Sequence, residues 1–173
     1  ILFKFFKGDY MKQRMQTFFL KTVLIFAGIA ALAFSLFALP KFAKKAAELV
    51  PEIAFLKYPF LFLMYVSVLT FLYSLFEIIR FLGYIDKGNA FSKLSVKSLK
   101  HIKLSGIVIT ILLYLTGMPA AYLVAEIDDA PGLIVIGFAL ASMPLVAAAF
   151  AAVFQRLFQE AMDIKSKNDC IDK

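Results

Sequence analysis

The sequence has no tryptophan, one cysteine and one histidine among its 173 residues. The single cysteine, Cys170, excludes an intrachain disulfide. The single histidine, His101, excludes a metal site built from several imidazoles, and it falls in a polar stretch between apolar runs. The chain also lacks a glycine-rich phosphate loop, an H-E-x-x-H motif and a nucleophile elbow. We therefore expect no metal, no cofactor and no enzymatic activity.

Charged residues are scarce, and long stretches of the chain contain almost none. They make up 18% of the residues, against 62% that are hydrophobic, whereas a soluble domain is usually about half apolar. The excess apolar surface must face lipid rather than water. Twenty phenylalanines fit such a surface without any cofactor.

Four apolar stretches are long enough to cross a membrane as helices, because a hydrocarbon core about 30 Å thick needs about 20 such residues. None of them shows the alternation of a strand, and a helix satisfies its own backbone in lipid. The predicted spans are residues 22–39, 58–79, 104–124 and 132–154. The predicted fold class is therefore all-α, with a bundle of four transmembrane helices forming one membrane domain over residues 22–154.

Lysine and arginine are distributed unequally between the two sides of this predicted membrane domain. Fifteen lie in the N-terminal segment 1–21, around the loop after the second span, and in the C-terminal segment 155–173, while four lie between the first two spans. The positive-inside rule then predicts a multi-pass protein of the cell membrane with both termini in the cytoplasm. The net charge of +7 does not indicate nucleic acid, because the basic residues flank apolar runs.

The start of the chain adds one open question. The stretch from Met11 reads like a natural bacterial start. We therefore assign no function to residues 1–10, and the sequence leaves open whether they are native. The C-terminal segment 155–173 is predicted to be a helix or tail that continues from the fourth span.

The loop between the second and third spans predicts an amphipathic cytoplasmic helix. After Asn89 or Ser92, which are typical helix caps, apolar residues at helical spacing face away from lysines. Such a helix lies at the headgroup level and places its basic side on anionic lipid. The residues expected to contact lipid are Lys93, Lys97, Lys100 and Lys103. A purely topological role for the same charges is the simpler interpretation.

The same loop resembles the signature of a known family. The stretch "GNAFSKLSVKSLKHI", residues 88–102, is similar to that of a bacterial membrane family called domain of unknown function 2975. Asn168 and Asp169 match an Asn-Asp element in the tail of that family, and Ser95 departs from the asparagine usual there. The resemblance implies a small four-helix protein of the bacterial inner membrane, and it implies no established activity.

Glu77 and Arg80 are the ionisable residues closest to the predicted hydrocarbon. They are three residues apart on a helix, so they are placed to form an ion pair at the cytoplasmic end of the second span. A carboxylate within a span is a candidate functional group by default. An interfacial salt bridge near a helix end explains the same pair without a function and is the simpler interpretation.

The third and fourth predicted helices each contain a Met-Pro pair. Each proline removes a backbone donor and kinks its helix, so two such helices packed together predict a pocket that opens outward. Prolines are also common in membrane helices that bind nothing. The candidate pocket residues are Tyr114, Met118, Pro119, Tyr122, Met143 and Pro144.

The sequence supports two classes of function. The first is a non-enzymatic accessory, sensor or immunity-type protein that binds membrane lipid, a membrane protein partner or a second copy of itself, and no nucleic acid. The alternative is a small transporter or lipophilic-ligand binder that uses the pocket at the Met-Pro pairs. The transporter is the weaker of these two, because no span carries a charged residue near its middle to couple to an ion gradient.

Overall fold

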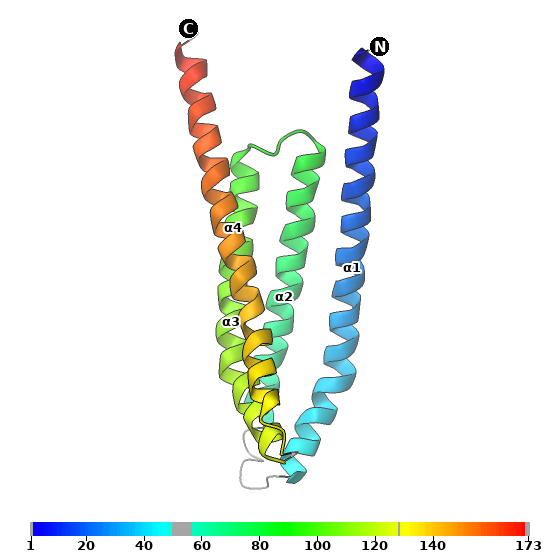
Figure 1. The fold of residues 1–173 in the computed structure, drawn as a ribbon, viewed down its shortest axis with the longest axis vertical. Helices are drawn as coiled ribbons and strands as arrows, with labels where there is room; N and C mark the ends of the chain where they lie inside the picture. The colour runs from blue at the N-terminus through cyan, green and yellow to red at the C-terminus, as the bar shows by residue number, and fades with distance from the viewer. Residues whose placement is uncertain (1, 50–56, 128, 172–173) are drawn as a thin grey trace.

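The computed structural model describes residues 2–49, 57–127 and 129–171, and those ranges contain four helices. They are α1 (Leu2–Leu49), α2 (Lys57–Asp86), α3 (Lys93–Ile127) and α4 (Gly132–Ile171). The helices run alternately up and down, so the two termini and the α2–α3 turn lie at one end, here called the terminal end (Figure 1). The α3–α4 turn lies at the opposite end, here called the far end.

Each of the four helices is long and apolar enough to cross a membrane. The all-α fold with four candidate spans is therefore confirmed. The helices extend well beyond the predicted spans: α1 continues through Pro40, and α4 continues through residues 155–171 of the predicted tail. Because a helix satisfies its own amides and carbonyls, it need not stop where the apolar run stops.

The predicted amphipathic helix between the second and third spans is wrong as a separate element. α3 begins at Lys93 and runs without a break to Ile127, so the basic stretch forms the first turns of a membrane helix. Leu99, on the apolar side of that stretch, is only 4% exposed and faces protein rather than lipid. An amphipathic pattern has the same spacing in both situations, which is why the sequence did not distinguish them.

The α2–α3 connection is a tight turn that leads directly into α3. Gly88 has a φ of 72°, in the left-handed region that glycine adopts without strain. The amide of Gly88 donates to the Ile85 carbonyl at 3.0 Å, and the Ser95 amide donates to the Ser92 hydroxyl at 3.2 Å. Ser92 therefore acts as the N-terminal cap of α3, as its position in the sequence predicted.

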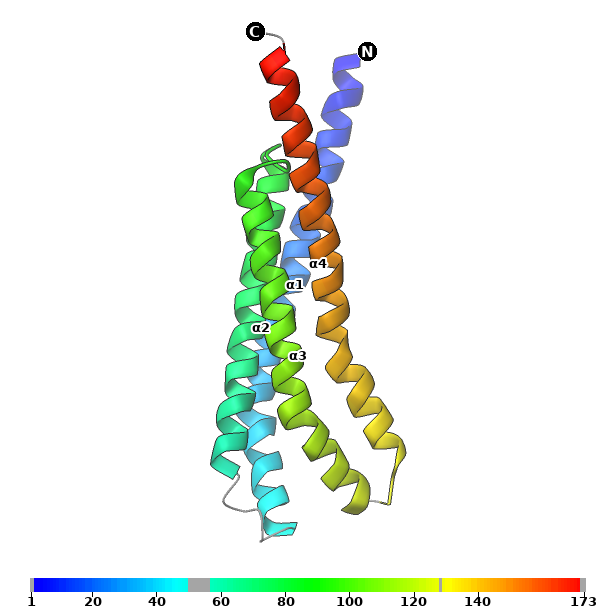
Figure 2. The ribbon, with the colours of Figure 1, turned by 90° about the vertical axis from the view of Figure 1, so that its left-hand side faces the viewer.

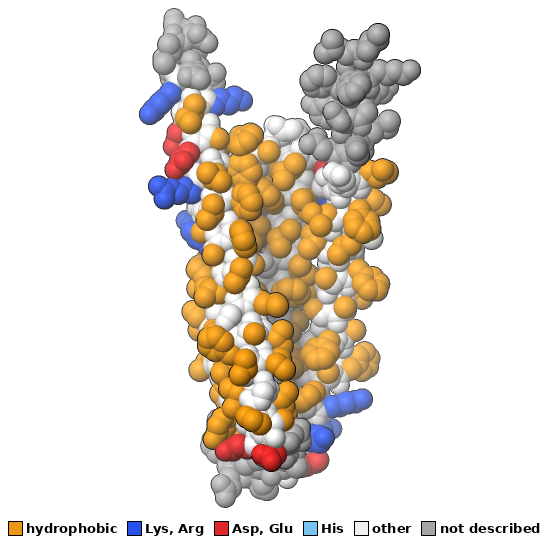
Figure 3. Space-filling model, viewed as in Figure 1, with side chains coloured by type: hydrophobic (Ala, Val, Ile, Leu, Met, Phe, Trp, Pro, Cys, Tyr) orange, Lys and Arg blue, Asp and Glu red, His pale blue; other side chains and the backbone are white. Residues whose placement is uncertain are grey.

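The four helices form an open row rather than a closed ring. Within the described ranges, α1 packs against α2, and α4 packs chiefly against α3, with one ring contact to α2 between Phe158 and Phe81 at 5.9 Å. α2 and α3 therefore occupy the middle of the row, and α1 and α4 form its two edges (Figures 1 and 2). Seen in space-filling form, the molecule is hollowed between these two edges (Figure 3).

Small hydroxyl side chains fill the middle of the row. Ser67, Ser105, Thr110 and Thr116 are buried, and each hydroxyl donates to the carbonyl four residues earlier, at 2.7–3.0 Å. Their polar atoms are thus satisfied inside their own helix, as a helix in lipid requires. Small side chains also allow neighbouring membrane helices to approach closely.

Candidate functional site

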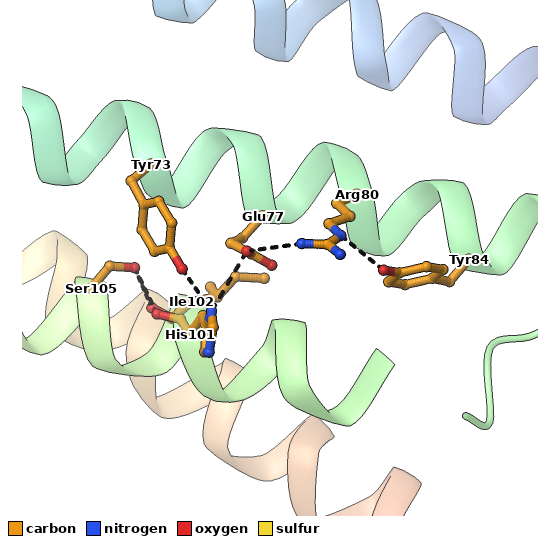
Figure 4. A network of polar contacts seen from close by, with 7 residues as sticks. All are labelled: Tyr73, Glu77, Arg80, Tyr84, His101, Ile102 and Ser105. Atoms are coloured by element: carbon orange, nitrogen blue, oxygen red, sulfur yellow. Dashed lines mark hydrogen bonds and ion pairs between the residues drawn. The ribbon is translucent and has the colours of Figure 1, made fainter. Parts of the chain in front are cut away.

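The candidate site is a group of polar side chains on α2 and α3, here called the polar seam, whose members are Tyr73, Glu77, Arg80, Tyr84 and His101 (Figure 4). The four residues from α2 are spaced by four, three and four positions, which places them along one side of that helix. His101 comes from α3, eight residues after its first residue, which is about 12 Å along the axis at 1.5 Å per residue.

Glu77 is the centre of the seam. It is 3% exposed. Among the side chains that the structure describes, it is the one acidic or basic residue that is buried. A carboxylate removed from water is costly unless cationic or hydrogen-bonding groups surround it. Both kinds of partner are present around Glu77, and they come from two different helices.

Two basic side chains face the Glu77 carboxylate. His101 Nδ1 lies 3.5 Å from Glu77 Oε1, and Arg80 Nη1 lies 3.8 Å from the same oxygen. The ion pair with Arg80 that the sequence predicts is therefore present in the structure. The contact with His101 adds a link from α2 to α3, which the sequence analysis did not foresee.

Two tyrosines position the basic groups. The hydroxyl of Tyr73 is 2.6 Å from His101 Nδ1, and Arg80 Nε donates to the Tyr84 hydroxyl at 2.8 Å. His101 Nδ1 thus lies near two oxygens: it accepts from the Tyr73 hydroxyl when the ring proton is on Nε2, and it donates toward Tyr73 or Glu77 when Nδ1 itself carries a proton. Through Nδ1, this ring therefore joins α3 to two residues of α2.

The seam opens to the outside through its basic groups. The Glu77 side chain is 4% exposed, whereas those of Arg80 and His101 are 52% and 35% exposed. Ser105, one turn further along α3, donates to the carbonyls of His101 and Ile102, at 2.9 and 3.1 Å, and so satisfies its own hydroxyl (Figure 4). The arrangement is a buried carboxyl group beside two basic side chains that reach the surface.

The sequence analysis missed His101 because it was assigned to the polar loop. Once α3 is known to begin at Lys93, the same residue falls inside a helix and opposite Glu77. A usable signal was present: a tyrosine, a glutamate and an arginine at positions 73, 77 and 80 mark a polar side on an otherwise apolar helix.

The four lysines expected to contact lipid lie on the first three turns of α3. Lys93, Lys97 and Lys100 are exposed and Lys103 is half-buried. Their contact with lipid stays a prediction. Their position at the terminal end places them on the same helix as His101 and within two turns of it.

The residues of the candidate pocket do not share one environment. Tyr114 joins α3 to α4, because its hydroxyl lies 2.7 Å from Ser142 Oγ and its ring packs against Phe138. Tyr122 and Met143 are instead 52% and 64% exposed. Pro119 and Pro144 lie inside α3 and α4, which both continue past them, and Met118 is half-buried. The pocket stays a prediction.

No group of three or more histidine, cysteine, aspartate or glutamate side chains gathers in the part of the chain that the structure describes. At the far end, the Tyr122 hydroxyl donates a hydrogen bond to Glu126 Oε1 at 2.7 Å. That contact joins two residues four positions apart on α3, so it stabilises the helix locally.

Comparison with known proteins gives a family and a relative. The family described as "Protein of unknown function (DUF2975)" matches residues 41–171, a range that contains the whole polar seam. The chain is 50% identical over 156 residues to the uncharacterized membrane protein YoaS of Bacillus subtilis (strain 168). The aligned region covers 90% of this chain and 97% of that protein. No solved structure matches it. The chain is therefore a membrane protein and belongs to the DUF2975 family.

Proposed function

We propose that the protein is a non-enzymatic accessory or sensor protein of the cell membrane that binds the headgroups of anionic phospholipids at the polar seam. In this proposal both termini and the α2–α3 turn are cytoplasmic, as the distribution of lysine and arginine predicts. The seam then lies at the inner boundary of the bilayer, where anionic headgroups are found.

The observation that carries the proposal is the exposure of Arg80 and His101 above the buried Glu77 carboxylate. Arg80 is held on one side by Tyr84, through its Nε, and it is 52% exposed. A guanidinium fixed in this way has donors left to bind a phosphate oxygen, and fixing it beforehand lowers the entropic cost of binding.

The lysines of α3 add attraction to the same region. Lys97 and Lys100 are exposed and lie within four residues of His101 on the same helix. Each basic residue near an anionic leaflet contributes about 1 kcal/mol. The lysines attract anionic lipid through their charge alone, whereas the seam holds its basic groups in fixed positions. Mutations in the lysines and in the seam therefore separate the two contributions to lipid binding.

A sensing role follows from the shared partners. A phosphate that binds Arg80 or His101 competes with Glu77 for the same cations, so the strength of the α2–α3 link depends on what occupies the seam. The proposal therefore predicts that anionic lipid changes the contact between these two helices. In phosphatidylcholine the choline cation offsets the charge of the phosphate, so this zwitterionic headgroup is expected to have a weaker effect.

The absence of tryptophan makes a direct test possible, because one introduced tryptophan is the sole indole in the protein. Leu104→Trp places it one turn after His101, at a residue that is 58% exposed. Phe150→Trp is the matched control: it is 62% exposed on α4 at a similar depth, since Gly106 of α3 contacts Ala148 of α4. Fluorescence quenching by brominated phosphatidylglycerol is compared with quenching by brominated phosphatidylcholine in nanodiscs.

The proposal predicts preferential quenching by the anionic lipid for Leu104→Trp and equal quenching by both lipids for Phe150→Trp. Adding Arg80→Gln lowers the preference about fivefold, which corresponds to about 1 kcal/mol. Arg156→Gln, which removes an exposed arginine of α4 paired with Glu160, leaves the preference unchanged. Equal quenching at both reporters, or equal effects of the two arginine substitutions, refutes a site at the seam.

A further inference from the structure

The two edges of the helix row have opposite charge at the far end of the molecule. On α1, Lys41, Lys44 and Lys45 are exposed and outnumber the exposed Glu48. At the other edge, Glu126 and Asp129 are exposed where α3 ends and α4 begins. In the space-filling view the lysines and the acidic groups lie at the same end of the apolar belt but over different helices (Figure 3).

These charges do not neutralise each other within one copy. Within the described ranges, α1 packs against α2 and not against α3 or α4, so the basic edge and the acidic edge are separated by the middle of the row. The ion pairs found among the described side chains likewise include no contact between the two edges.

We infer that two copies of the chain associate side by side in the membrane, with α1 of each copy against the α4 edge of the other. A two-fold axis parallel to the helices produces this contact twice and at the same depth, because each copy presents one basic and one acidic edge. The far-end lysines of one copy then face the far-end acids of its partner, at both contacts. This inference goes beyond the lipid-binding proposal and does not depend on it.

The apolar surface of the two edges fits such a contact without being the reason for it. Lipid tails are as apolar as leucine, so exposed apolar side chains alone do not drive helices together in a bilayer. Close approach between helices is what stabilises them there, and small residues permit it. Exposed alanines occur on both edges: Ala27, Ala30, Ala33, Ala139, Ala147 and Ala149.

Charge complementarity decides which edges meet. An arrangement with α1 against α1 brings lysine against lysine, and one with the α4 edges together brings acid against acid; both are disfavoured by repulsion. The α1-to-α4 arrangement is the one that pairs opposite charges. Exposed ion pairs determine the orientation and the choice of partner more than the affinity. Reversing the charges on one edge is therefore expected to change which edges of the two copies meet.

Cysteine crosslinking between copies with different tags tests the inference. All variants carry Cys170→Ser, and one copy carries Lys44→Cys while the other carries Glu126→Cys. We expect a disulfide-linked pair containing both tags. Tyr58→Cys, at a residue of α2 that is 75% exposed and also at the far end, replaces Lys44→Cys as the matched control and is expected to give little product with Glu126→Cys.

Charge reversal provides the second measurement, read as the dimer fraction from stepwise photobleaching in liposomes at low protein density. Lys44→Glu with Lys45→Glu lowers the dimer fraction about fivefold, and so does Glu126→Lys with Asp129→Lys. All four changes in one chain restore it, because the edges are again complementary. Monomers at every density, product from Lys44→Cys in both copies, or no recovery in the fourfold variant overturns the inference; each of these leaves the lipid result standing.

Discussion

The α3–α4 contact is much closer than the α1–α2 contact, although both join antiparallel apolar helices at a glycine. A Cβ added to Gly106 of α3 would lie 2.9 Å from the Ala148 Cβ and 2.9 Å from the Pro144 carbonyl oxygen of α4. A Cβ added to Gly28 of α1 would meet only side-chain ends, Leu75 Cδ1 at 3.4 Å and Leu72 Cδ2 at 3.7 Å. One glycine brings two backbones together, and the other faces a flexible side chain.

Burial along the two edge helices shows the same contrast. In the most apolar stretch of α1, 6% of the residues are buried, against 11% in α4 and 17% in α2 and in α3. Near the middle of α1, Lys21 forms a salt bridge with Asp86 at the end of α2. We therefore regard α2, α3 and α4 as the rigid part of the molecule and α1 as a helix attached along a narrow stripe.

The largest effect is expected for Gly106→Leu. The new side chain has no space between α3 and α4 because the Pro144 carbonyl oxygen and the Ala148 Cβ of α4 lie 2.9 Å from its Cβ, so the helices must separate. Overpacking of this kind costs about 3 kcal/mol in the free energy of unfolding. Gly117→Leu, at a glycine of the same helix with nothing within 4 Å, serves as the control and is expected to cost nothing.

Unfolding in mixed micelles, followed by circular dichroism, measures both variants. Equal stability of Gly106→Leu and Gly117→Leu would contradict the close α3–α4 contact.

A smaller loss is expected for Glu77→Ala, which removes the anion between α2 and α3. His101 and Arg80 then lose their shared partner while staying partly covered, and the cost is about 2 kcal/mol after allowing for their exposure to solvent. Glu160→Ala is the matched control, because Glu160 also pairs with an arginine on its own helix but both side chains are exposed, at 58% and 83%.

Exposed pairs of that kind are worth little, so Glu160→Ala is expected to leave the unfolding midpoint where it is. The same micelle experiment separates the two glutamates. A loss as large for Glu160→Ala as for Glu77→Ala would show that burial at the seam has no energetic consequence.

The smallest of the three effects is expected for Gly28→Leu in α1. Its neighbours Leu72 and Leu75 are side chains that can move aside, so the expected cost is about 1 kcal/mol. The more specific prediction is local: a spin label on α1 becomes more mobile, while one on α4 keeps its spectrum. A change on α4 as large as that on α1 would contradict the division into a rigid part and an attached helix.

The four candidate membrane spans could be predicted from the sequence because the bilayer sets the length of an apolar helix directly. The ion pair of Glu77 with Arg80 was also predictable, since both residues lie on one helix three positions apart. Contacts between helices were not. Leu99 and His101 lie in a stretch whose amphipathic pattern fits a surface helix as well as a buried one, so neither the start of α3 nor the seam followed from it.

The open row of helices lay beyond sequence reasoning for a related reason. In a soluble bundle, polar residues mark the outer face of each helix. Here Phe26 of α1 and Phe150 of α4 are 74% and 62% exposed, and nothing about a phenylalanine in the sequence indicates whether it is exposed or buried. Apolar residues face both lipid and protein, so the sequence does not specify which helices are neighbours.

Cysteine accessibility in intact cells tests most directly that the chain crosses the membrane four times with its terminal end in the cytoplasm. In a Cys170→Ser background, Lys87→Cys places a thiol in the α2–α3 turn and Asp129→Cys places one in the α3–α4 turn, and both native residues are exposed. A membrane-impermeant maleimide is predicted to label Asp129→Cys in intact cells and Lys87→Cys only after permeabilisation. The reverse pattern, or equal labelling of both before permeabilisation, would contradict the account.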